Sequence, residues 1–146
     1  MTSIKKIAQN YAAADQLHAL DFQGLMAQGY QSVINLRSPL EKGFLVNEDA
    51  LVAEAGLEYR HLPLSPTKAD PQAIEAVLGA IQTLPKPILI HCAAGARAGV
   101  VALIALAIEE NLGHNEVFQK AQELGISLQQ PQLQQFLNHY LAATPA

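Results

Sequence analysis

The sequence predicts an α/β domain in which helices cover both faces of a central, mostly parallel sheet, giving three α/β/α layers. Apolar runs of strand length alternate along the chain with segments of helical periodicity. The clearest of these runs are nearly continuous in apolar residues, as strands buried on both faces are. The chain has 146 residues, 50% of them hydrophobic, and no repeat or linker divides it. We therefore expect a single domain over residues 1–146.

Four segments are predicted to be strands. In chain order they are residues 7–12, where the pattern is weakest, and residues 31–36, 57–64 and 87–92. The second, "QSVINL", is rich in residues that favour strands, and the third alternates between polar and apolar side chains. The fourth, "PILIHC", is the most apolar, so we expect it to be buried.

Helical patterns fall between and after these strands. Asp21 is the predicted N-cap of the first helix, which ends at Gly29, and Asn47 is the predicted cap of the second. Asp70 and Pro71 combine a cap with proline at the first helical position, which is a strong start signal for the third.

Three more helices are predicted after the fourth strand. Residues 98–110 are apolar on nearly every side, which predicts a central, buried helix. Residues 117–124 and 133–141 each carry one apolar face. The glutamine-rich stretch 129–135 is interpreted as a solvated helix start, with a partner surface as the alternative.

The turn between the fourth strand and the buried helix carries the clearest chemistry. Cys92, the only cysteine, ends the strand, and Arg97 follows after the small residues "AAGA". Ligands bind at the carboxyl ends of strands in such folds, and the unpaired N–H groups of a helix start can cradle an anion or a thiolate. Arg97 adds a fixed charge. We therefore predict that Cys92 is a nucleophile, with an inert buried thiol as the alternative.

The residues around this turn are candidate ligand contacts. Four small residues are predicted to bind an anion through their backbone: Ala93, Ala94, Gly95 and Ala96. His91 precedes the cysteine and could equally be an ordinary strand histidine. Arg37, at the end of the second strand, is a second anion contact or a solvated strand-end arginine. His61 is interpreted as structural.

The stretch "HCAAGAR" resembles the signature of the cysteine-dependent phosphatases, which is His-Cys, five residues, Arg, then Ser or Thr. The segments "SVINLR", "AEAGLEYRHLPL" and "PILIHC" resemble a bacterial group of the protein tyrosine and dual-specificity phosphatase superfamily. This group is the phosphatase-like domain that is also fused to β-lactamase-like hydrolases and is sometimes called a sulfur transferase. The resemblance covers roughly residues 5–125. It implies a dual-specificity-phosphatase-like fold in which Cys92 is the nucleophile, His91 orders the loop and Arg97 binds the anion.

The loop departs from that signature in two places. Four residues, and not five, separate Cys92 from Arg97. This spacing resembles rhodanese-like sulfurtransferases, and the shorter ring suits one sulfur atom better than a phosphoryl group. Ala98 stands where both families usually carry Ser or Thr. Because that hydroxyl helps the thiolate to leave in phosphatases, we expect slower turnover in phosphate chemistry.

A phosphatase also needs a general acid that protonates the leaving oxygen. The resemblance implies an Asp on the loop after "HLPL", near the position of Pro66. Asp70 is the only carboxylate of that segment and is the candidate acid, although capping a helix explains it as well. Glu41 is another candidate. Sulfane-sulfur transfer needs no such acid, because the leaving thiolate is a modest base.

Three functions follow from these residues. The first, slightly favoured, is sulfane-sulfur transfer from a donor through a Cys92 persulfide to an external thiol or cyanide. The second is phosphomonoester hydrolysis through a phosphocysteine, and the third is an anion-binding module whose catalysis has decayed. The expected partner is accordingly a small oxyanion, a phosphoester or a sulfane-sulfur donor.

Composition argues against several other classes of protein. A formal net charge of -4 without a basic run argues against nucleic acid or an anionic membrane as a partner. One cysteine excludes an internal disulfide, and the five histidines lack close metal-ligand spacing, so we expect no metal and no cofactor. We find neither an apolar signal segment nor an apolar stretch of the ~20 residues that span a bilayer, and we expect a cytoplasmic protein.

Overall fold

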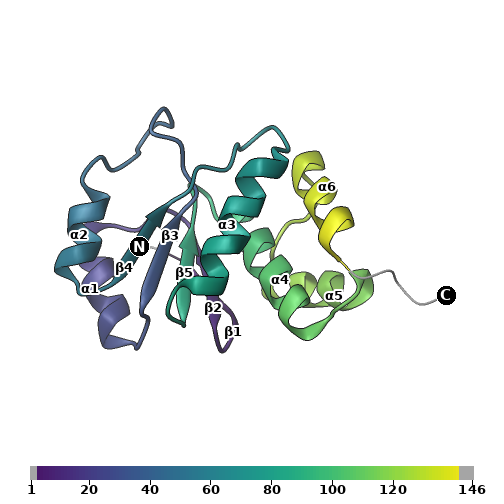
Figure 1. Cartoon of the computed structure of the whole chain (residues 1–146), viewed down its shortest axis with the longest axis horizontal. Coiled ribbons are helices and arrows are strands. Elements are labelled where there is room, and N and C mark those ends of the chain that lie inside the picture. Colours follow the sequence, from purple (N-terminus) through teal and green to yellow (C-terminus); the bar gives the residue numbers. More distant parts are fainter. Residues whose placement is uncertain (1–2, 142–146) are drawn as a thin grey trace.

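The computed structural model describes residues 3–141, and over that range the chain forms five strands and six helices (Figure 1). The strands are β1 (Ile4–Ala8), β2 (Tyr11–Ala14), β3 (Ser32–Asn35), β4 (Glu58–His61) and β5 (Ile88–His91). The helices are α1 (Ala19–Ala27), α2 (Glu48–Glu54), α3 (Pro71–Thr83), α4 (Ala96–Glu110), α5 (His114–Leu124) and α6 (Pro131–Tyr140).

The strands form one mixed sheet in the order β1-β2-β5-β3-β4. β1 pairs antiparallel with β2, and the other pairings are parallel. At the carboxyl end of the central strand β5, His91 pairs with Ala14 of β2 and with Asn35 of β3. The chain therefore leaves three neighbouring strands at the same edge of the sheet, and the residues that follow them meet there.

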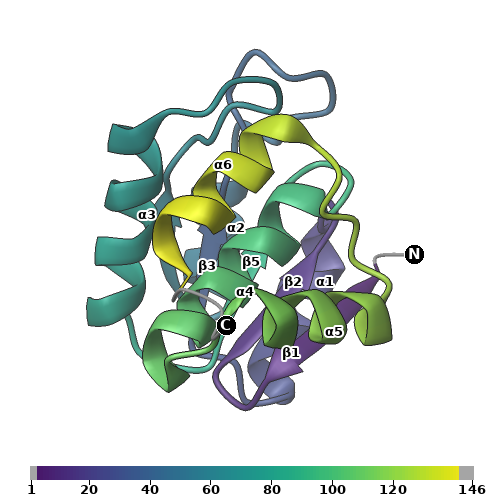
Figure 2. The same cartoon turned by 90° about the vertical axis from the view of Figure 1, so that its right-hand side faces the viewer.

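Helices cover both faces of this sheet, which confirms the predicted three-layer α/β/α architecture (Figures 1 and 2). α1 and α2 cover one face, where Phe22 and Val52 pack in a cluster with Val33 and Leu89 of the sheet. α3 and α4 cover the other face, and α5 and α6 pack on α4. Every residue of α4 from Arg97 to Ala107 is buried, so the predicted central helix is confirmed.

Two predicted strand boundaries are wrong. In place of one strand over residues 7–12, the structure has a hairpin of β1 and β2 that turns at Gln9 and Asn10. The alanine-rich β2 has little intrinsic strand preference, but all of its residues are buried. β4 is shorter than the predicted 57–64 and ends before Pro63, which has no N–H to donate to a neighbouring strand.

Helix starts agree with the prediction at α3 and differ at α1. The Oδ1 atom of Asp70 accepts two N–H groups of the first turn of α3, at 3.1 and 3.3 Å, as its predicted capping role requires. His18 is the N-cap of α1, and the Asp21 carboxylate accepts the His18 N–H at 2.8 Å. α4 begins at Ala96, two residues before the predicted start, directly after Gly95 in the left-handed region.

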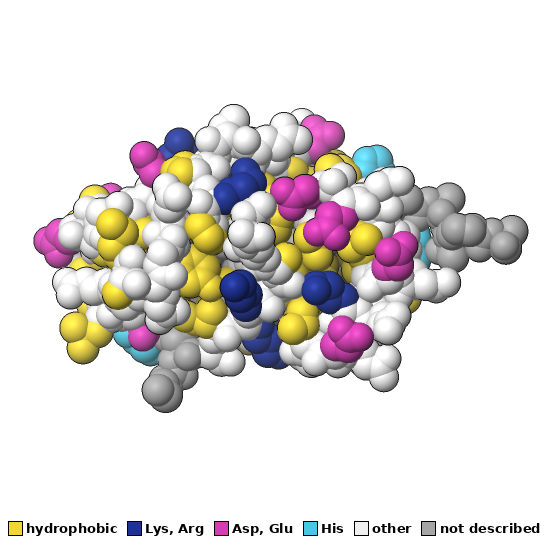
Figure 3. Space-filling model, turned by 90° about the horizontal axis from the view of Figure 1, so that it is seen from below, with side chains coloured by type: hydrophobic (Ala, Val, Ile, Leu, Met, Phe, Trp, Pro, Cys, Tyr) yellow, Lys and Arg dark blue, Asp and Glu magenta, His cyan; other side chains and the backbone are white. Residues whose placement is uncertain are grey.

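Figure 3 shows the molecule from the lower end of Figure 1, away from the loops that follow the parallel strands. On this face the Lys and Arg side chains lie among hydrophobic and acidic ones. No helix in the described part of the chain has the length and apolar character needed to cross a bilayer.

Candidate active site

Cys92 lies at the edge where the parallel strands end. It follows β5 directly, and its N–H donates to the Ala14 carbonyl of β2 at 3.2 Å. The residue is 1% exposed. The loop from Cys92 to Gly95 leads straight into α4, so the central strand delivers a thiol to the amino end of a buried helix.

Two backbone N–H groups point at the Cys92 sulfur. The Gly95 nitrogen lies 3.1 Å from Sγ and the Ala98 nitrogen lies 3.5 Å from it. Gly95 turns its N–H inward with a φ of 105°, a backbone conformation that a residue with a Cβ rarely adopts. These bonds and the positive end of the α4 dipole both stabilise negative charge on the sulfur.

Two carbonyl groups of the loop are held by hydrogen bonds to neighbouring segments. The Ala93 carbonyl accepts from the Gln16 N–H at 3.1 Å, and the Gly95 carbonyl accepts from the Gly99 N–H of α4 at 2.9 Å. With these oxygens held outward, the inner side of the loop presents N–H groups. This is the arrangement that binds an oxyanion or a thiolate.

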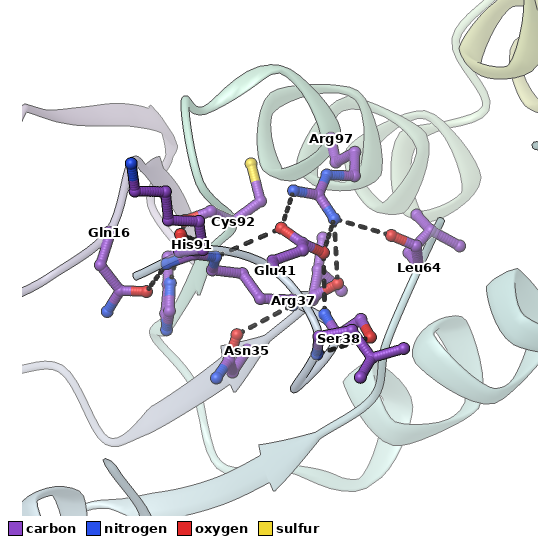
Figure 4. Close-up of polar contacts among 12 residues, drawn as sticks. Gln16, Asn35, Arg37, Ser38, Glu41, Leu64, His91, Cys92 and Arg97 are labelled. Carbon is purple, nitrogen blue, oxygen red and sulfur yellow. Dashed lines mark hydrogen bonds and ion pairs between the residues drawn. The ribbon is translucent and has the colours of Figure 1, made fainter. Parts of the chain in front are cut away.

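Arg97 is the second residue of α4, and its guanidinium lies beside the Cys92 side chain (Figure 4). Nη1 and Nη2 donate to the two carboxylate oxygens of Glu41 at 2.9 and 2.8 Å, and Nη1 also donates to the Leu64 carbonyl at 2.8 Å. Burial alone would lower the pKa of Arg97, but its contacts with Glu41 and Cys92 raise it, so the guanidinium stays charged.

Glu41 is held in its ionised form. Besides Arg97, it accepts from the Arg37 Nε at 3.3 Å and from the Ser38 N–H at 2.8 Å. Burial alone would raise the pKa of Glu41, but these hydrogen bonds and the charge of Arg97 lower it to about 2. A carboxylate that is ionised at neutral pH has no proton to donate, so this arrangement does not suit a general acid.

Arg37 is buried, at 4% exposure, and is therefore not a solvated strand-end residue. In addition to its bond with Glu41, its guanidinium donates to Gln16 Oε1 at 2.7 Å and to the Lys42 carbonyl at 2.5 Å. The two arginines thus share one carboxylate next to the loop. The three charges together sum to one net positive charge beside the Cys92 sulfur.

His91 forms a buried pair with Glu48, the first residue of α2. The His91 Nε2 lies 2.6 Å from a Glu48 oxygen, and the two side chains are 0% and 1% exposed. Gln16 Nε2 donates to the other Glu48 oxygen at 3.0 Å. Glu48 and Gln16 were not among the residues predicted from the sequence. An acidic residue after the predicted cap Asn47 is a common helix-start feature, and nothing in the pattern connected it with the cysteine.

The residues proposed as the general acid lie in different surroundings. Asp70 uses its carboxylate to cap α3, and no hydrogen bond or ion pair within residues 3–141 joins it to the Cys92 loop. The backbone of Pro66 is held by Gln132, whose Nε2 donates to its carbonyl at 2.6 Å. The structure therefore brings together Cys92 and Arg97 and leaves Asp70 in a capping role.

A cavity of about 250 Å³ borders the loop at the edge of the sheet. Its lining includes Ala94, Gly95 and Ala96, with Lys5 and Asp15 as the charged side chains. Among the described residues, no group of three or more His, Cys, Asp or Glu is placed to hold a metal ion.

A thiol at the end of the central strand, an N–H-lined loop and an arginine at the start of a buried helix define a phosphatase-like α/β domain of the cysteine-dependent type. The comparison with known families agrees with this class. The chain belongs to the family of the beta-lactamase hydrolase-like protein, phosphatase-like domain, whose model matches residues 3–109.

Relatives are similar to this chain in sequence, and solved structures are similar to it in fold. A beta-lactamase hydrolase-like protein of Xylella fastidiosa is 31% identical over 117 residues, which cover 78% of this chain and 27% of that protein. The chain thus spans about a quarter of the length of the curated relatives it matches. A DUF442 protein of Shewanella putrefaciens superposes with a TM-score of 0.81 at 23% identity, over 95% of this chain and 93% of that one. TpbA of P. aeruginosa, solved in complex with phosphotyrosine, gives a TM-score of 0.72 at 14% identity, over 92% and 82%.

Proposed function

We propose that this protein transfers sulfane sulfur through Cys92. In the first step the Cys92 thiolate attacks the outer sulfur of thiosulfate or of a persulfide, the donor S–S bond breaks, and sulfite or a thiolate leaves with the electron pair. In the second step an external thiolate attacks the sulfur carried by Cys92, leaves as a persulfide and restores the Cys92 thiolate. Neither step needs an oxidant, because each exchanges one S–S bond for another.

The residues of the loop have separate roles in this proposal. The N–H groups of Ala93 to Ala96 and the Arg97 guanidinium hold the negative charge of the incoming donor and of the Cys92 persulfide. His91 orders the loop, and Arg37 adds positive charge behind it. We place the reaction in the cytoplasm, where external thiols are reduced and abundant.

One observation carries the choice of sulfur transfer over phosphate hydrolysis. The carboxylate that meets Arg97, Glu41, has a pKa of about 2, and Asp70 is occupied in capping α3. Hydrolysis of a phosphoester requires a protonated acid for its leaving oxygen, whereas a thiolate leaves without one. The four-residue spacing between Cys92 and Arg97 supports the same choice.

Intact-mass spectrometry tests the proposal. After treatment with thiosulfate or a persulfide donor, the protein should gain about 32 Da, one sulfur atom, and lose it again with an excess of external thiol. Cys92→Ser, treated in parallel, should gain nothing and transfer nothing. A wild-type protein that never gains this mass under either donor would overturn sulfur transfer.

Phosphomonoester hydrolysis is the second candidate, and the match to a phosphatase-like family favours it. In this reaction the Cys92 thiolate attacks phosphorus, the alcohol leaves with a proton from an acid, and water hydrolyses the phosphocysteine. The acid would be Asp70, once it is released from its cap, because it is the only carboxylate of its segment. Like the phosphotyrosine bound by TpbA, the substrate would be a small phosphoester.

Phosphomonoester hydrolysis is tested by measuring the turnover of a small aryl phosphate. Hydrolysis that vanadate inhibits and that Cys92→Ser abolishes would support it. Complete inactivity at acidic and neutral pH would contradict it. The third candidate, an anion-binding module without catalysis, predicts that neither sulfur nor phosphate chemistry occurs, so any turnover lost in Cys92→Ser would rule it out.

A further inference from the structure

Glu48 is a buried carboxylate that the proposed chemistry does not use. It is 1% exposed, and the burial of an ionised carboxylate is costly unless hydrogen bonds compensate for it. His91 at 2.6 Å and Gln16 at 3.0 Å supply such bonds, and the Tyr59 hydroxyl is a third polar neighbour of this carboxylate. His91 and Gln16 also contact the Cys92 loop, so the position of Glu48 bears on the geometry of the loop.

The contacts of these two residues are with the loop carbonyls. The other ring nitrogen of His91, Nδ1, lies 3.3 Å from the Cys92 carbonyl oxygen. The backbone N–H of Gln16 donates to the Ala93 carbonyl at 3.1 Å. These two oxygens must face away from Sγ if the loop is to present N–H groups to a ligand. Glu48 holds the two residues that keep them there.

The same carboxylate is linked to Arg97 through side chains alone. Gln16 presents its Nε2 to Glu48 and its Oε1 to Arg37, at 3.0 and 2.7 Å. Arg37 donates a hydrogen bond to the Glu41 carboxylate, which also accepts hydrogen bonds from the Arg97 guanidinium. Figure 4 shows the hydrogen bonds of this series that link Gln16, through Arg37 and Glu41, to Arg97. The chain of contacts therefore runs from one end of the loop to the other.

We propose that Glu48 is a positioning residue that fixes the Cys92 loop in its anion-binding form, by holding His91 and Gln16 against the loop carbonyls. This role goes beyond the proposed function, because it applies to any group that Cys92 attacks. Among the described residues, no hydrogen bond joins Glu48 to the Cys92 sulfur, so its role is positioning and not catalytic. The alternative is a purely structural role, in which the carboxylate only stabilises the amino end of α2.

The test uses Glu48→Gln, which keeps the size of the side chain and removes its charge. The neutral amide forms no charge-assisted bond with the His91 ring. Its NH₂ group must face either the Gln16 NH₂ group or the His91 Nε2, which would then have to become an acceptor. The matched control is Glu54→Gln, the same change at the exposed last residue of α2. The readout is the rate of Cys92 alkylation by iodoacetamide against pH, followed by intact mass.

A positioning role changes the reactivity of the thiol as well as the stability of the fold. We expect Glu48→Gln to lower the alkylation rate at pH 7 roughly tenfold, because the variant loses a charge-assisted hydrogen bond that holds the loop. The pH at which the alkylation rate rises should also move to a higher value. Glu54→Gln should follow the wild-type profile. A folded Glu48→Gln variant with the wild-type profile would overturn the proposal, even if its melting temperature is lower.

A second variant covers the case in which Glu48→Gln does not fold. Gln16→Ala removes the side-chain link and leaves the backbone bond to Ala93 in place, and we expect a smaller shift of the profile in the same direction. An unchanged profile for Gln16→Ala would then overturn the proposal. Alkylation requires no sulfur donor, so these outcomes are independent of whether Cys92 gains sulfur.

Discussion

Glu41 lies between two arginines that the chain brings from different elements, Arg37 after β3 and Arg97 in α4. The Arg97 guanidinium is buried, and Glu41 supplies its countercharge. Removing one partner of such a pair leaves an uncompensated charge in the interior, which costs more than the pair itself contributes. The site therefore depends on Glu41 for stability as well as for charge balance.

Glu41→Gln should lower the free energy of unfolding by about 3 kcal/mol at pH 7, the lower end for a broken buried pair, because Glu41 is 15% exposed. The folded pKa of Glu41, about 2, is below the ordinary value of 4.5, so its stabilisation is complete above pH 4.5 and is lost as the pH falls toward 2. Urea denaturation at pH 7 and at pH 2.5 should therefore show a gap between wild type and variant that closes in acid. Glu58→Gln, at an exposed carboxylate of β4, is the control. A gap of the same size at both pH values would contradict this assignment.

At the scale of the element, α3 depends on a single cap. The structure shows Asp70 as a cap, and the second candidate function would make it a general acid. The two roles predict different variants to be harmful. A cap needs an acceptor oxygen, which Asn also provides, whereas a general acid needs a carboxyl. The pair of substitutions Asp70→Ala and Asp70→Asn therefore separates structure from chemistry.

Asp70→Ala should lower the free energy of unfolding by about 1 kcal/mol, because the two N–H groups of the first turn lose their acceptor. Asp70→Asn should remain within a few tenths of a kcal/mol of the wild type, since Asn caps about as well. Chemical denaturation measures both. Sulfur loading of Cys92 should be unchanged in each variant. A folded Asp70→Asn protein that loses aryl phosphate turnover would instead assign the acid role to Asp70.

On the scale of the whole molecule, the position of the site depends on how α4 packs between the sheet and the outer segments. Gly99 lies in the second turn of α4, and a Cβ at that position would come within 2.8 Å of Ile126 Cγ2 in the segment after α5. A side chain at Gly99 would therefore require the Ile126 side chain to shift. The glycine thus permits a close approach that intrinsic helix propensity would disfavour.

Gly99→Ala should lower the free energy of unfolding by about 1–3 kcal/mol through overpacking. Gly79→Ala is the matched control, because that helical glycine in α3 has open space around its Cβ position and should gain up to about 1 kcal/mol. The double variant Gly99→Ala with Ile126→Ala should recover part of the loss. Equal effects at the two glycines, measured by thermal denaturation, would contradict the packing explanation.

Sequence patterns predicted the parts of the fold that depend on neighbouring residues. The run "PILIHC", the small residues after it and the apolar helix that follows were predicted from local composition, and the structure has them as β5, the loop and α4. The cap at Asp70 is local in the same sense. The β1–β2 hairpin was not predicted correctly, because burial and not intrinsic preference makes strand β2 extended.

The sequence by itself determined that a thiol ends a buried strand and that an arginine follows it at four-residue spacing. Tertiary structure alone decided what those two residues face. The partner of Arg97 is Glu41, 56 residues away, and the partner of His91 is Glu48, 43 residues away. Such pairs leave no periodic signal, because they arise where the ends of parallel strands meet at one edge of the sheet. Local sequence sets the position of the thiol, and the fold sets its electrostatic surroundings.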